Sequence, residues 1–93
     1  MVEIEDIRLK RPFEDNTFII IEGKSVEGLP GLCAQLFLPP DRYEYLGTIS
    51  VPGKELTIKE LESFVEEVEK LAKKAIEKHR LELFLGTKGY KRF

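Results

Sequence analysis

Apolar positions in the first half of the chain recur mostly at every second residue, the spacing of β-strands. Residues 2–10 keep this alternation with one slip of phase at Glu5–Asp6, so we predict a single strand with a β-bulge there. Residues 17–21 are apolar without alternation, which is typical of a strand covered on both faces. The remaining segments are expected to be a loop at 23–31, a strand at 32–38, a turn at 39–41 and a strand at 43–51.

A long amphipathic helix follows these strands. Thr57 and Glu60 stand at the two ends of a capping box, in which each side chain satisfies a free backbone N–H of the first turn. The helix is expected to end near His79–Arg80, and the alternation in residues 81–85 indicates a short fifth strand. The apolar stripe of the helix consists of Leu61, Phe64, Val65, Val68, Leu71, Ala72, Ala75 and Ile76.

These elements predict an α+β fold in one domain, residues 1–93. Short connections between consecutive strands favour an antiparallel four-stranded meander, packed in two layers against the helix. Residues 86–93 form a basic and aromatic C-terminal tail. In this order of elements the chain is similar to the single-strand-binding transcriptional coactivators and the Whirly proteins, which dimerise and hold single strands on their sheets. The resemblance covers the order of elements alone.

One helix covers one face of a sheet, whereas the strands at 17–21 and 32–38 are apolar on both faces. We therefore predict a homodimer through an apolar sheet face, since large exposed apolar patches are rare on monomers and two-fold dimers are the commonest oligomers. A ligand, another macromolecule, or a sheet that curls on itself are the alternatives. The residues expected at this sheet face or dimer contact are Ile19, Ile21, Phe37, Tyr43 and Tyr45.

The chain is 34% charged with a net charge of −2, but the charge is unevenly distributed. Residues 1–69 hold 7 basic and 15 acidic side chains, a net −8, whereas residues 70–93 hold 8 basic and 2 acidic ones, a net +6. A helix dipole explains basic residues near the helix end, but not those beyond it. The basic excess therefore makes nucleic acid a second candidate partner. The contacts expected there are Lys74, Lys78, Arg80, Lys88, Tyr90, Lys91, Arg92 and Phe93.

Residues suited to catalysis or metal binding are scarce. One cysteine, Cys33, and one histidine, His79, are the soft and imidazole groups of the chain, and Cys33 is expected to be a buried structural thiol. We therefore expect no enzyme, no metal and no cofactor. High Glu and Lys with few amides indicates a thermophilic source.

The sequence shows no apolar run of about 20 residues and no leader, so we expect a cytoplasmic protein without membrane contact. The favoured hypothesis is a small non-enzymatic interaction module, homodimeric through its sheet, that docks with a protein or ribonucleoprotein assembly. A domain that binds single-stranded or RNA-type nucleic acid through the basic helix end and tail is the first alternative. A small enzyme is the second.

Overall fold

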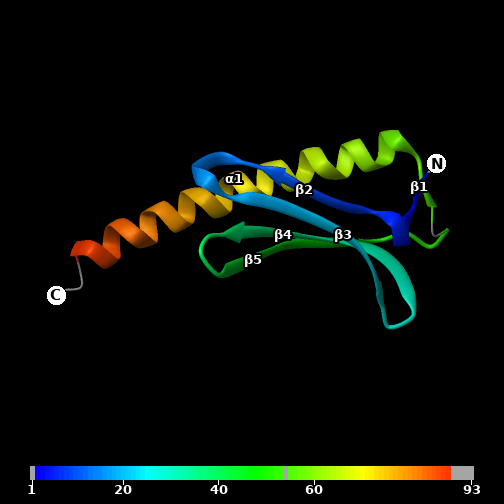
Figure 1. The fold of residues 1–93 in the computed structure, drawn as a ribbon, viewed down its shortest axis with the longest axis horizontal. Coiled ribbons are helices and arrows are strands. Elements are labelled where there is room, and N and C mark those ends of the chain that lie inside the picture. The colour runs from blue at the N-terminus through cyan, green and yellow to red at the C-terminus, as the bar shows by residue number, and fades with distance from the viewer. Residues whose placement is uncertain (1, 54, 89–93) are drawn as a thin grey trace.

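The computed structural model describes residues 2–53 and 55–88, and it has the predicted α+β architecture (Figure 1). Four antiparallel strands form a meander in the order β2-β3-β4-β5, and a separate two-stranded ribbon pairs β1 with β6. One long helix lies across one face of the four-stranded sheet (Figure 1). The elements are β1 (Val2–Glu3), the 3₁₀ turn η1 (Ile4–Asp6), β2 (Arg8–Pro12), η2 (Glu14–Asn16), β3 (Phe18–Val26), β4 (Leu29–Leu38), β5 (Arg42–Ser50), β6 (Glu55–Leu56) and α1 (Ile58–Lys88).

The slip of phase near the N-terminus is a 3₁₀ turn, so the prediction of one bulged strand over residues 2–10 was wrong. The turn η1 separates β1 from β2 and closes with a 3.1 Å hydrogen bond from the Ile7 N–H to the Ile4 carbonyl. A 3₁₀ turn brings residues three apart onto one side. Ile4 and Ile7 are both buried, which explains why the chain turns here rather than bulging.

The predicted loop at 23–31 is instead the tip of a long β-hairpin. Strands β3 and β4 stay paired as far as Val26 and Leu29, and the two residues between them, Glu27 and Gly28, both have positive φ (52° and 80°). Positive φ at both central residues is typical of the type I′ turn that suits twisted hairpins. Gly23 is required for a different reason, because a Cβ there would lie 1.7 Å from the Ile4 carbonyl oxygen.

The capping box is confirmed by two reciprocal hydrogen bonds. The Thr57 N–H donates to Glu60 Oε1 (2.9 Å), and the Glu60 N–H donates to Thr57 Oγ1 (3.0 Å). The far end of the helix differs from the prediction, since α1 continues to Lys88 and residues 81–85 are helical rather than a fifth strand. Leucine and glutamate are strong helix formers, and five alternating residues do not interrupt a helix that is already formed.

The core lies between α1 and one face of the sheet. Buried residues of α1 recur at every fourth position, and alternate residues of β3 and β4 face them. The turn η1 packs on the same face, since Ile4 belongs to the core and its carbonyl lies against Gly23, the cross-strand partner of the buried Leu32. The central core residues are Ile19, Ile21, Leu32, Ala34, Leu36 and Leu38 from the sheet, with Phe64, Val68, Ala72 and Ile76 from the helix.

Candidate binding surface on the open sheet face

The face of the sheet opposite α1 is defined by the register of the four strands. Directly paired residues of neighbouring strands lie on the same face of a sheet. The partners of buried residues therefore lie on the face under α1, and the residues between them lie on the opposite face. In β3, Ile19 and Ile21 are 1% and 0% exposed beneath the helix, whereas Phe18 and Ile20 point to the other side and are half-buried. We call this second side the open face. Its members are Arg8, Lys10 and Pro12 of β2, Phe18, Ile20, Glu22 and Lys24 of β3, Cys33, Gln35 and Phe37 of β4, and Tyr43, Tyr45 and Thr48 of β5.

The five residues expected at the sheet face therefore do not lie together. Phe37, Tyr43 and Tyr45 are on the open face, but Ile19 and Ile21 belong to the core under α1. The reason is the unbroken apolar run in β3, which carries no alternation to tell one face from the other. Pairing with β4 sets the phase, because Ile19 is opposite the buried Leu36.

Aromatic rings cross the open face from β3 to β5. The centroids of Phe18 and Phe37 are 6.5 Å apart, and those of Phe37 and Tyr43 are 4.8 Å apart with an interplanar angle of 41°. Tyr43 and Tyr45 are 58% and 62% exposed, although tyrosine carries a large apolar ring. A 2.7 Å hydrogen bond joins the Tyr45 hydroxyl to Thr48 Oγ1 and holds that ring in place.

The basic side of the open face lies on β2 and β3. The Lys10 ammonium is 4.9 Å from the centroid of the Phe18 ring, a cation–π contact. Arg8 lies opposite Glu22 in the register, and Lys24 follows on β3. The open-face positions of β4 and β5 carry no charged side chain among the described residues. With three cations and one carboxylate, the open face has a formal charge of +2, whereas the whole chain has −2.

Cys33 is half-buried on the open face, so it is more accessible than the buried structural thiol expected from the sequence. Together with Ile20, Glu22, Lys24 and Gln35 it lines a small hollow. Among residues 2–53 and 55–88, no group of three or more His, Cys, Asp or Glu side chains is placed to hold a metal ion. Within the same residues, α1 is too polar along its length to cross a membrane.

The basic residues expected to contact nucleic acid are only partly described. Lys74 and Lys78 are exposed on α1, and Arg80 is paired with Asp15 and Glu14 of η2. The Arg80 guanidinium donates a hydrogen bond to Asp15, which holds the pKa of that carboxyl below its ordinary value and raises the pKa of Arg80. Lys88 is the last described residue of α1. The remaining expected contacts lie outside the described residues: Tyr90, Lys91, Arg92 and Phe93.

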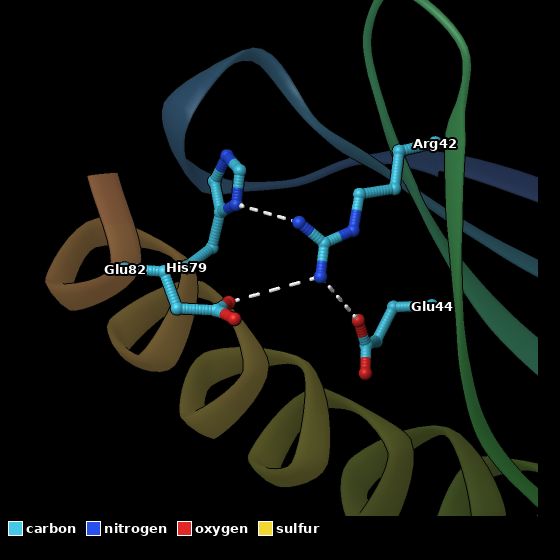
Figure 2. A network of polar contacts seen from close by, with 4 residues as sticks. All are labelled: Arg42, Glu44, His79 and Glu82. Carbon is cyan, nitrogen blue, oxygen red and sulfur yellow. Dashed lines mark hydrogen bonds and ion pairs between the residues drawn. The ribbon is translucent and has the colours of Figure 1, made fainter. Parts of the chain in front are cut away.

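A network of polar contacts around Arg42 joins β5 to α1 (Figure 2). Its guanidinium lies 3.5 Å from His79 Nδ1, 3.4 Å from Glu44 Oε1 and 3.7 Å from Glu82 Oε1. No local pattern predicts this network, because the partners from α1 are far from Arg42 along the chain. His79 was expected in the last helical turn, but α1 continues beyond it to Lys88. Exposed ion pairs of this kind contribute about 0–1 kcal/mol each, so the network adds little to the stability of the fold.

Several members of the open face were not predicted from the sequence, namely Arg8, Lys10, Phe18 and Ile20. The signal for the first two was present, since Arg8 and Lys10 alternate with the apolar Ile7 and Leu9. Comparison with protein families, with curated proteins and with solved structures finds no match for this chain.

Proposed function

We propose that this protein is a small non-enzymatic interaction module and that the open face is its binding surface. The observation that carries the proposal is the exposure of Tyr43 and Tyr45, at 58% and 62%, beside a row of aromatic rings on the side of the sheet opposite α1. Exposed aromatic clusters rimmed by polar residues mark sites of interaction on soluble proteins. The fold serves this role by holding the rings on three paired strands, so that little conformational entropy is lost on binding.

A non-enzymatic role is supported by the composition of the same surface. The open face offers one thiol, one carboxylate and three cations. Glu22 lies opposite Cys33 in the register, but no hydrogen bond joins the two among the described residues, and the described part of this face holds no histidine. Nucleophilic catalysis needs a base within hydrogen-bond reach of the nucleophile. Binding is therefore the chemistry for which these side chains are suited. The homodimer expected from the sequence stays a prediction.

Site-specific photo-crosslinking tests the proposal for a partner of any chemical class. A benzophenone amino acid replaces Tyr45 in one variant and Ile58, an exposed residue at the start of α1, in a matched control. Each purified protein is irradiated alone and in a lysate of its source organism. We expect an adduct of defined mass at position 45 and not at position 58. The same adducts at both positions, or no adduct at position 45, would contradict the proposal.

A further inference from the structure

We propose that the open face binds single-stranded nucleic acid, with unpaired bases stacked on its aromatic rings and phosphates at its basic side. This inference rests on the proposed function, because it names the class of partner for the same surface. It differs from the nucleic-acid alternative drawn from the sequence, which used the basic end of α1 and the tail. The β-strands of the sheet, rather than α1, would then contact the nucleic acid.

The charge of the open face favours an anionic partner. Arg8, Lys10 and Lys24 are exposed there against a single carboxylate, Glu22, on a chain whose net charge is negative. Such a local reversal of sign steers polyanions toward one surface of a protein. A second copy bound face to face would instead bring two surfaces of +2 together, and like charges across an interface are unfavourable. An anionic partner is therefore favoured over a second copy.

The aromatic side of the face favours unpaired bases. Tyr43 and Tyr45 are two residues apart on one side of β5, which places them roughly 7 Å apart along the strand. Every base has a π-face, so exposed aromatic rings on a sheet bind single strands with little dependence on sequence. Bases in a duplex are stacked on one another and cannot be inserted in this way. The open face therefore fits a single strand better than a duplex.

The basic side and the aromatic side of the open face are close enough for one nucleic-acid strand to contact both. Neighbouring strands of a sheet are about 4.8 Å apart, so β2 lies roughly 10 Å from β4. Lys10 lies between the basic side and the aromatic side. It belongs to β2, at the edge of the sheet, and its ammonium is 4.9 Å from the centroid of the Phe18 ring. A nucleic-acid strand with its bases on Phe37 and Tyr43 would carry its phosphates toward β2. Tyrosine hydroxyls and the Gln35 amide add hydrogen-bonding groups beside the bases.

Fluorescence anisotropy with the full-length chain tests the inference. The probes are labelled 20-nucleotide oligo(dT) and oligo(rU), which separate DNA from RNA, and a 20-base-pair duplex of mixed sequence. We expect both or one of the single strands to bind at least tenfold more tightly than the duplex in low salt. Binding should weaken with salt with a slope of about −2 in log–log form, since single strands give about −0.7 for each neutralised phosphate.

Two pairs of double variants locate the contacts. The variant Tyr43→Leu/Tyr45→Leu keeps apolar bulk but removes the rings, so it should weaken single-strand binding about tenfold or more, whereas Tyr43→Phe/Tyr45→Phe should bind within about threefold of the wild type. The variant Arg8→Gln/Lys10→Gln should reduce the salt slope by about 1.4. The matched control Lys74→Gln/Lys78→Gln removes the same charge from α1 and should leave the slope unchanged. Circular dichroism confirms that each variant is folded.

Several results would overturn the inference. No binding of either single strand, equal binding of the duplex, or loss of binding only in the Lys74→Gln/Lys78→Gln variant each excludes the open face as a single-strand site. A dimer in light scattering that Tyr43→Leu/Tyr45→Leu converts to a species of about 10.7 kDa would assign the face to a second copy. If single strands do not bind but position 45 gives a specific crosslink to a protein, the open face is still a binding surface and only the nucleic-acid partner is rejected. If that crosslink is also absent, both proposals are rejected.

Discussion

The ring of Phe37 on β4 and the ring of Tyr43 on β5 lie 4.8 Å apart between centroids, on the side of the sheet that faces away from α1. They are directly opposite each other in the strand register, so the pairing of backbone groups sets the distance between the rings. This contact links the fold to the surface on which we propose that binding occurs. Both rings lie outside the core under α1, so substitutions there should alter the binding surface more than the stability of the sheet.

The two faces of β3 differ in burial and should differ in their sensitivity to truncation. Ile21 is fully buried under α1, whereas its neighbour Ile20 is half-buried on the open face. The Ile21→Ala variant should lose about 2–5 kcal/mol of the free energy of unfolding, because it leaves a cavity in the core. The Ile20→Ala variant should lose less than about 2 kcal/mol. Urea titrations followed by circular dichroism measure both, and equal losses would contradict the assignment of the faces.

Gly23 should be intolerant of any side chain. A Cβ there would meet the Ile4 carbonyl oxygen at 1.7 Å, so β3 and η1 would have to separate. The Gly23→Ala variant should lose about 3 kcal/mol of the free energy of unfolding, the upper end of the usual cost of overpacking. Gly53→Ala is the matched control, because a Cβ at Gly53 meets nothing within 4 Å. A Gly23→Ala protein as stable as the Gly53→Ala control would show that η1 does not pack on β3 as described.

The capping box at the start of α1 should contribute measurably to stability. Thr57→Ala removes the hydroxyl that accepts the Glu60 N–H, so it should destabilise the protein by about 1 kcal/mol and lower its thermal midpoint. Ser63→Ala, an exposed change within the same helix, is the control and should be neutral or slightly stabilising. A thermal melt of each variant decides the comparison. No difference between the two variants would argue against the cap.

Stability should fall in acid through Asp15 and Glu60. The hydrogen bond from Arg80 lowers the pKa of Asp15, and hydrogen bonds from the backbone and side chain of Thr57 lower that of Glu60. A carboxyl whose pKa is lower in the folded state stabilises the fold above its unfolded pKa and loses this contribution as the pH falls through the folded value. Between about pH 5 and pH 2, Asp15→Asn should therefore flatten the dependence of unfolding free energy on pH.

The control for this pH dependence is Asp41→Asn, an exposed carboxyl next to β5. Denaturant titrations at pH 7, 5 and 3 give the free energy of unfolding of each protein. A profile for Asp15→Asn that matches those of the wild type and the control would refute the role of the Arg80 contact.

Local patterns predicted most of the fold correctly. The capping box and the apolar stripe of the helix are short-range signals, because a helix satisfies its own backbone within four residues. Two other local patterns were ambiguous. Glycines occur in the tight turn of a hairpin as well as in a loop, so the hairpin at 23–31 was missed, and the five alternating residues at 81–85 fit a helix as well as a strand.

The candidate surface was predictable only in part. Tyr43, Tyr45 and Phe37 alternate with residues of the opposite face, so their common side could be inferred. The phase of β3 was not predictable, since its apolar run carries no alternation and is set by pairing with β4. The contact of Lys10 with Phe18 depends on the register between β2 and β3 and has no local signal.

Binding of a single strand to the open face is tested most sharply by titrating the ¹⁵N-labelled protein with oligo(dT) or oligo(rU) and following the chemical shifts of its backbone amides. We expect the largest changes to map to the open face, at Lys10, Phe37, Tyr43 and Tyr45, while the amides of Lys74 and Lys78 on α1 move little. Shift changes concentrated on α1, or no changes at saturating oligonucleotide, would contradict single-strand binding by the sheet.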